Sequence, residues 1–151
     1  MPFITVKALA GVLGDAAKAA LVAGICAAAA ECEQVPEDPK MRALCVVTIE
    51  EIAAGNCTFG GRDLSQMLVW FDGTVNIPRG VLNDGSRACF VDLLHQAVIA
   101  ALPDEKRRIT SSFIINEIED GTWGASGNLW KLPDFAAASG YRHLQHLVVN
   151  R

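Results

Sequence analysis

Residues 35–55 read VPEDPKMRALCVVTIEEIAAG, and residues 102–121 read LPDEKRRITSSFIINEIEDG. Both stretches begin with an apolar residue, a proline and acidic residues, and both end with Glu-Ile, two further residues and a glycine. Matching positions lie about 66 residues apart, the length of one strand-helix-strand unit with its connection. A repeat that occurs only twice indicates two similar halves and not a solenoid.

The first half is predicted to hold a strand, a helix and a second strand. Residues 2–8 (PFITVKA) are apolar and β-branched, which is typical of a strand. Asp15 can cap a helix that extends to about Glu31, and its many alanines allow a close approach to a sheet. Pro36 ends that helix, and residues 44–50 form the second strand.

The second half repeats this order. Residues 67–71 are predicted to form a strand, and residues 76–85 form a loop rich in Gly, Pro and Asn. Ser86 or Asp84 caps the next helix, and residues 112–116 form the fourth strand. The apolar residues of this helix recur at helical spacing: Phe90, Val91, Leu94, Ala97, Val98 and Ala101.

These elements predict an α/β (α+β) fold in which two fused β-α-β units form a four-stranded, mainly parallel sheet with two helices on one face. Strand-helix-strand connections of this kind are right-handed and parallel. The units are assigned to residues 1–64 and 65–130, and residues 131–151 form a tail that is helical near 141–149 and lies at an oligomer interface. The uncovered sheet face and its edges require a partner, so we expect an oligomer.

Composition and charge exclude several classes of partner. The net charge is −4 and the pI is near 5.3, which argues against a nucleic-acid-binding surface. The apolar stretch from Ala16 to Ala30 is short and is interrupted by Lys18, so no membrane segment is expected, and the predicted location is cytoplasmic. Five cysteines without a C-x-x-C pair are interpreted as buried thiols, not as disulfides or a zinc site.

Four features together resemble the tautomerase superfamily, which includes 4-oxalocrotonate tautomerase. Pro2 follows the initiator methionine, Gly11 follows the first strand, and the strand-helix-strand unit occurs twice. The ends of the halves, residues 51–61 and 117–127, are similar to the family's strand-end pattern of Glu, a turn, an aromatic residue and a glycine-rich hairpin. The resemblance covers about residues 2–130, and it is closest to the long fused members related to malonate semialdehyde decarboxylase and cis-3-chloroacrylic acid dehalogenase.

The resemblance implies that Pro2 is the catalytic amine of a cofactor-independent homotrimer. Removal of Met1, which is usual before a proline, leaves Pro2 as a free secondary amine. Burial of an amine in an apolar pocket disfavours its ammonium form and makes it a base near neutral pH. In the family this amine moves a proton on a small carboxylated carbonyl compound.

Family members hold the substrate carboxylate with arginine, whose guanidinium matches a carboxylate in two-point geometry. Val12 stands where the short tautomerases carry an arginine, which is a departure from the family. The resemblance assigns this role to Arg79, in the loop after the third strand, with Arg87 as a second substrate-binding residue. Solvated surface charges remain the alternative interpretation of both arginines.

The resemblance places Trp123 as an aromatic wall beside the proline. The residues with which the dehalogenating members prepare water are replaced by Ala29 and Ala125, so hydrolytic dehalogenation is not expected. Asp38 lies within one position of the aspartate that malonate semialdehyde decarboxylase uses. This keeps a decarboxylase or hydratase open as an alternative, and a turn aspartate is the other interpretation of Asp38.

A further alternative is an oligomeric binding protein that has the fold without the chemistry. If Met1 stays attached, the Pro2 nitrogen is an amide and accepts no proton, which favours this alternative. His143 and His146 stand at i,i+3 spacing, but no third ligand is evident, so no metal site is expected.

Overall fold

The computed structural model describes residues 2–148. Its first half contains β1 (Phe3–Leu9), α1 (Asp15–Cys32), α2 (Pro39–Arg42) and β2 (Val46–Ile52). The second half contains β3 (Leu68–Pro78), α3 (Asp84–Ala101) and β4 (Arg108–Ile118). A hairpin of β5 (Trp123–Ala125) and β6 (Asn128–Trp130), helix α4 (Leu132–Ser139) and a 3₁₀ helix, η1 (Arg142–Leu147), complete the described chain.

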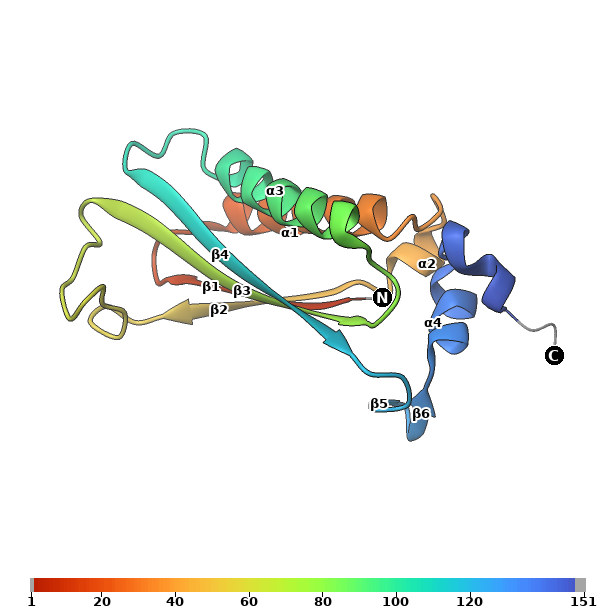
Figure 1. The fold of residues 1–151 in the computed structure, drawn as a ribbon. Coiled ribbons are helices and arrows are strands. Elements are labelled where there is room, and N and C mark those ends of the chain that lie inside the picture. Colours follow the sequence, from red (N-terminus) through yellow and green to blue (C-terminus); the bar gives the residue numbers. More distant parts are fainter. Residues whose placement is uncertain (1, 149–151) are drawn as a thin grey trace.

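The main sheet has four strands in the order β2-β1-β3-β4. Strands β1 and β2 pair in parallel, as do β3 and β4, whereas β1 and β3 pair antiparallel. Helices α1 and α3 lie side by side on one face of this sheet (Figure 1). The predicted fold class, two β-α-β units forming a mainly parallel sheet with helices on one face, is confirmed.

Backbone hydrogen bonds repeat between the two units. The N–H of Ala10 donates to the carbonyl of Ile52 at 2.9 Å, and the N–H of Arg79 donates to the carbonyl of Ile118 at the same distance. In each unit this bond joins the residue after the first strand to the end of the second strand. The two units therefore share local geometry, and the repeat in the sequence is a repeat in structure.

An ion pair also recurs at this place in both units. Lys18, in the first turn of α1, lies 3.4 Å from Glu51 of β2, and Arg87, in the first turn of α3, lies 2.8 Å from Glu117 of β4. Each pair ties the start of a helix to the end of the parallel strand that follows it. The second pair is less exposed, because the Glu117 side chain is 18% exposed and that of Glu51 is 39% exposed.

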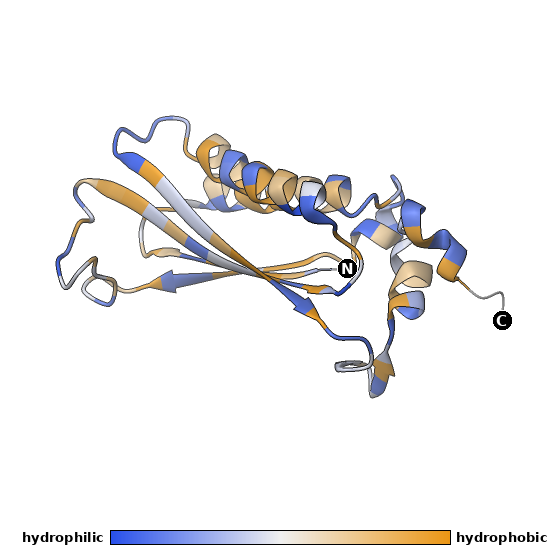
Figure 2. Ribbon diagram, in the orientation of Figure 1, coloured by the Kyte–Doolittle hydropathy of each residue, from blue (hydrophilic) through white to orange (hydrophobic). Residues whose placement is uncertain are grey.

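The core lies between the sheet and the two long helices. Figure 2 shows apolar residues gathered on the strands and on these helices, whereas the loop between α3 and β4 is hydrophilic. In β1 and β3 alternate residues are buried, as expected for strands with one covered face. Gly24 of α1 lies so close to Ala97 of α3 that a Cβ atom at Gly24 would come within 2.8 Å of the Ala97 side chain. Small residues thus permit the close approach of the two helices.

Several element boundaries differ from those predicted. Strand β3 continues to Pro78 into the predicted loop, and β4 spans Arg108–Ile118, because each residue of one strand pairs with a residue of the other over this whole length. The tail begins with α4, and η1 lies within the segment predicted to be helical near 141–149. Residue 149 lies outside the described residues, as does Met1.

Within residues 2–148 no helix is both long and apolar enough to cross a membrane.

We expect Arg87→Met to lower the free energy of unfolding by about 1–3 kcal/mol, because it leaves the largely buried Glu117 carboxylate without its donor. Lys18→Met changes the equivalent, more exposed pair of the first unit and is expected to cost less than about 1 kcal/mol. Urea unfolding of both variants measures the difference. Equal losses of unfolding free energy in the two variants would contradict the stronger contribution of the Arg87–Glu117 pair.

Candidate active site

Pro2 lies at the start of β1 and is buried. Its carbonyl accepts a hydrogen bond from the N–H of Val46 at 3.1 Å, which continues the parallel pairing of β1 with β2. In the antiparallel pairing Phe3 faces Asn76, so Pro2 lies beside the end of β3. Pro2 is therefore held in place by the sheet.

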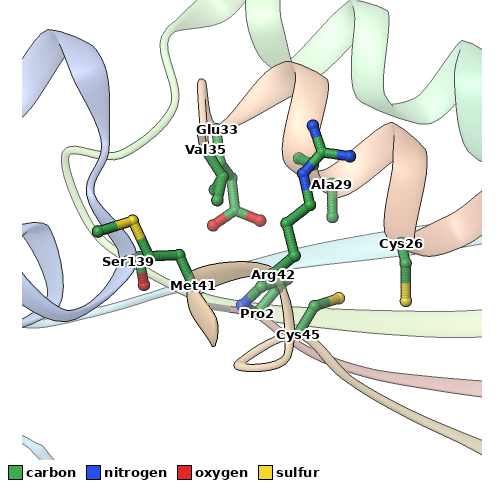
Figure 3. A pocket seen from close by; sticks show the side chains of 10 residues that line it. Pro2, Cys26, Ala29, Glu33, Val35, Met41, Arg42, Cys45 and Ser139 are labelled. Atoms are coloured by element: carbon green, nitrogen blue, oxygen red, sulfur yellow. The ribbon is translucent and has the colours of Figure 1, made fainter. Parts of the chain in front are cut away.

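Pro2 lines a pocket between the end of α1, α2, the segment before β2, and α4 (Figure 3). The enclosed space is about 10 Å³, which is room for a single water molecule, within a hollow of about 250 Å³ that includes open solvent. The other lining residues are Cys26, Ala29, Ala30, Glu33, Val35, Met41, Arg42, Cys45 and Ser139.

Glu33 supplies a buried carboxylate to this pocket. It is the C-cap residue of α1, directly after Cys32, and it is 0% exposed. Burial raises the pKa of the Glu33 carboxyl group above its usual value, because a low-dielectric environment disfavours the charged form. A buried acid beside Pro2 can exchange or share a proton with a group in the pocket.

Ser139 adds a hydroxyl group from the last residue of α4. Its side chain is 1% exposed, and its Oγ atom has no hydrogen-bond partner among the described residues. A buried hydroxyl group of this kind costs free energy unless it is satisfied. The pocket therefore presents polar atoms to a water molecule or a small polar ligand.

Arg42, the last residue of α2, is the cation of this pocket. Its Nε donates to the carbonyl of Pro36 at 3.1 Å, and one Nη lies 3.8 Å from the Glu37 carboxylate. The Arg42 side chain is 43% exposed, and the long, exposed ion pair leaves the guanidinium group accessible to an anion at the mouth of the pocket.

Asp38 holds α2 in place instead of lining the pocket. Its carboxylate accepts hydrogen bonds from the N–H groups of Lys40 at 2.8 Å and Met41 at 3.4 Å, as an N-cap residue does. The Asp38 side chain is not among the lining residues. It acts on the site through the helix that carries Met41 and Arg42.

The two arginines predicted from the sequence for the site do not line the pocket, and they pair with carboxylates at the end of β4 and directly after it. Arg79, directly after β3, forms an ion pair with Glu119, and both side chains are about 60% exposed. Arg87 lies 2.6 Å from Asp84 and 2.8 Å from Glu117. Because β1 and β3 are antiparallel, Arg79 is at the same end of the sheet as Pro2.

Trp123 contacts the residue next to Pro2. Its ring packs edge-on against Phe3 and against Phe135, with 5.2 Å between ring centroids in both cases. Trp130 packs on the same Phe135 at 5.1 Å. Trp123 thus belongs to an aromatic cluster that supports the start of β1, and it does not line the Pro2 pocket.

The remaining candidates from the sequence lie in several different parts of the fold. Ala29 lines the pocket, Ala125 lies in β5, and Val12 packs against the core. The Nε2 atom of His143 lies 2.9 Å from the carbonyl of Val81 and can donate a hydrogen bond to it. Residues 2–148 contain no group of three or more potential metal ligands, and His146 lies with His143 in η1.

The sequence reasoning missed Glu33 and Arg42. Glu33 stands seven residues after Cys26 and four after Ala29, so all three lie on the same face of a helix. This helical spacing could have indicated that Glu33 points inward. Arg42 lies within the quoted repeat, but its position in a short helix after Pro39 could not be read from periodicity.

Comparison with known proteins identifies structures of the same fold. No protein-family model and no curated protein sequence matches the chain. A fused 4-OT described as a wild-type asymmetric trimer has a TM-score of 0.68 and 18% identity, covering 84% of this chain and 94% of its own. N1, a member of the cis-3-chloroacrylic acid dehalogenase family, has a TM-score of 0.68 and 17% identity, covering 97% of this chain and 92% of its own.

A third structure of this fold is Pt0534 inactivated by 2-oxo-3-pentynoate. It has a TM-score of 0.66 and 15% identity, and the match covers 85% of this chain and 94% of its own. The fold predicted from the resemblance, that of the fused tautomerases, is therefore confirmed.

We expect Asp38→Ala to lower the free energy of unfolding by about 1 kcal/mol, the usual cost of a lost N-cap. Asp63→Ala is the matched control, because the Asp63 carboxylate also accepts a bond from an N–H two residues later, that of Ser65, but in a loop outside the Pro2 pocket. Chemical unfolding and the reactivity of the arginines toward phenylglyoxal measure both effects. Greater reactivity of Arg42 in Asp38→Ala alone agrees with its positioning role, and no change would contradict it.

Proposed function

We propose that this chain is a tautomerase in which Pro2, after removal of Met1, moves a proton on a small carboxylated carbonyl compound such as a 2-oxo acid or its enol. The observation that carries the proposal is the buried Pro2, which shares a pocket with a cation, Arg42, and an acid, Glu33. The fold is that of fused 4-OT structures, and one protein of this fold is inactivated by 2-oxo-3-pentynoate.

The secondary amine of a mature Pro2 can act as the base. The pocket around it is largely apolar, and burial disfavours the ammonium form relative to water. Glu33 acts in the opposite direction, since a nearby carboxylate stabilises the ammonium form. Together these two opposing effects bring the pKa of the Pro2 amine toward neutral pH, where an acid-base group is most efficient.

The substrate carboxylate is proposed to bind at the mouth of the pocket. The enclosed space holds only one water molecule, so a larger substrate occupies the surrounding open hollow. Arg42 is the cation nearest to this position in the pocket lining, and Arg79 is proposed as a second one because its ion pair with Glu119 is exposed and exchangeable. In this proposal Arg87 and Trp123 do not bind the substrate directly. Arg87 holds Glu117 of β4, and Trp123 packs on Phe3 next to Pro2.

A hydratase or decarboxylase is the second candidate, and the buried Glu33 favours it. Glu33 and the unsatisfied hydroxyl of Ser139 lie at a space the size of one water molecule, and a carboxylate can draw a proton from such a water. In that reaction Pro2 remains protonated and acts as the acid. Glu33, not Asp38, is the carboxylate proposed for this role, because the Asp38 carboxylate caps α2.

We further propose a homotrimer. The sheet face opposite α1 and α3 carries exposed apolar side chains, among them Phe3 of β1, Val46 of β2 and Ile114 of β4, which are 40%, 41% and 56% exposed. A face of this kind is stabilised by burial against another subunit. The fused 4-OT of the same fold is described as a trimer.

We expect Pro2→Ala to lower kcat/KM for the conversion of phenylenolpyruvate to its keto form by at least about 100-fold, the usual contribution of a general base. Pro103→Ala changes an exposed proline outside the pocket and is expected to leave the rate unchanged. Absorbance of the enol measures the rate. An unchanged rate in Pro2→Ala would refute the assigned role.

Intact mass of the same samples reports whether Met1 is present, and retained Met1 would favour the inactive binding protein.

We expect Glu33→Gln to shift the midpoint of the pH profile of kcat/KM to a pH about 1 unit lower, because the ammonium form of Pro2 loses a stabilising negative charge. Glu31→Gln makes the same change in charge on an exposed position of α1 and should leave the profile in place. If Pro2 acts as a base, the rate decreases at pH values below the midpoint. If Pro2 acts as an acid in a hydratase, the rate decreases at pH values above it. Equal profiles for the wild type and Glu33→Gln would contradict a contact between Glu33 and Pro2.

A further inference from the structure

Two of the five cysteines meet in the Pro2 pocket. Cys26 comes from α1 and Cys45 from the segment between α2 and β2, and both line the pocket beside Pro2 (Figure 3). Their side chains are hydrogen-bonded to each other, and both thiols are free. Packing of α1 against the segment before β2 brings the two side chains together in the pocket, although the residues are far apart in the sequence.

The hydrogen bond makes the two thiols unequal. The thiol of Cys45 donates to the sulfur of Cys26, which lowers the pKa of Cys26 to about 7 despite its partial burial. The same bond, together with burial, raises the pKa of Cys45. Cys26 thus carries a large share of thiolate at neutral pH, and Cys45 stays protonated. The thiolate is the nucleophilic form of cysteine.

A second pair of cysteines provides an internal comparison. Cys32 of α1 is hydrogen-bonded to Cys89 of α3, but burial and the neighbouring charges raise the pKa of Cys32 to about 12. Cys32 therefore remains a thiol at neutral pH. Cys32 and Cys26 both belong to thiol pairs of α1, but only the pKa of Cys26 is lowered.

We propose that Cys26 is a site of oxidation by hydrogen peroxide and that Cys45 is its resolving partner, so that the two form a reversible disulfide beside Pro2. The pocket suits this reagent, because its enclosed space admits a molecule about the size of water. Peroxide reaches Cys26 through the same opening as a ligand of Pro2.

The oxidation of Cys26 and Cys45 to a disulfide takes two steps. The Cys26 thiolate attacks one oxygen of hydrogen peroxide, a sulfur–oxygen bond forms, the oxygen–oxygen bond breaks, and hydroxide leaves as water after taking a proton. Cys26 becomes a sulfenic acid and the peroxide is reduced. The Cys45 sulfur then attacks the Cys26 sulfur, a disulfide forms, the sulfur–oxygen bond breaks, and the second water leaves with the Cys45 proton.

The disulfide joins α1 to the segment before β2 across the pocket. It removes the negative charge of the Cys26 thiolate from the surroundings of Pro2 and fixes two walls of the pocket to each other. The oxidation itself does not depend on what Pro2 does. Its effect on catalysis rests on the proposed function, and the two are measured separately.

The test treats the reduced, full-length protein with a small excess of hydrogen peroxide at neutral pH and follows its intact mass. We expect a loss of two hydrogen masses and of two titratable thiols, reversed by dithiothreitol. Peptide fragmentation must assign the bond, because the tryptic peptide 19–40 carries Cys26 and Cys32, and the peptide 43–62 carries Cys45 and Cys57. A bond between Cys26 and Cys45 supports the proposal.

The variants separate the two roles. In Cys45→Ala the first step stops at the sulfenic acid, which dimedone should trap on Cys26, whereas Cys26→Ala should form neither product. Cys57→Ala is the control and should behave as the wild type, and circular dichroism checks that each variant is folded. A Cys32–Cys89 disulfide, first oxidation at Cys57, or no dimedone adduct on Cys26 would overturn the proposal. Enol conversion in the same samples reports the effect on Pro2, and its absence would count against the proposed function alone.

Discussion

The antiparallel pairing of β1 with β3 is the constraint on which the rest of the structure depends. Each β-α-β unit pairs its own strands in parallel, and only this central pairing joins the units into one sheet. It sets the start of β1 beside the end of β3, so Phe3 and the residues that follow it lie inside the sheet and not at its edge. Pro2 is buried for this reason, and the last turn of α1 then closes over it.

The two units have equivalent backbones but unequal chemistry. In the second unit Arg87 pairs with Glu117 of β4 and Arg79 with Glu119 directly after β4, and Arg87 takes the position that Lys18 has in the first unit. The first unit and α4 supply the pocket, with the acid Glu33 from the end of α1 and the cation Arg42 from α2. The two units thus share a backbone arrangement and differ in the side chains that they bring to this end of the sheet.

The fold could be predicted from the sequence because its signals are local and repeated. The two copies of the quoted stretch and the helical spacing of Leu94 and Val98 are independent of distant contacts. The ends of β3 were not predictable in this way, since β3 is extended by its pairing with β1 and β4. The pocket was predicted only in part: Pro2 was found from its position in the chain, whereas Arg42 and Cys45 reach the pocket through tertiary packing that no local pattern records.

The central claim is that the first residue of the mature chain is a buried amine that gains and loses a proton near neutral pH. The most direct measurement is a ¹⁵N NMR titration of protein labelled at proline. The account predicts that one proline nitrogen, that of Pro2, changes its chemical shift with pH and reaches its midpoint near neutrality. A Pro2 nitrogen with the shift of an amide and no change across the titration would contradict it.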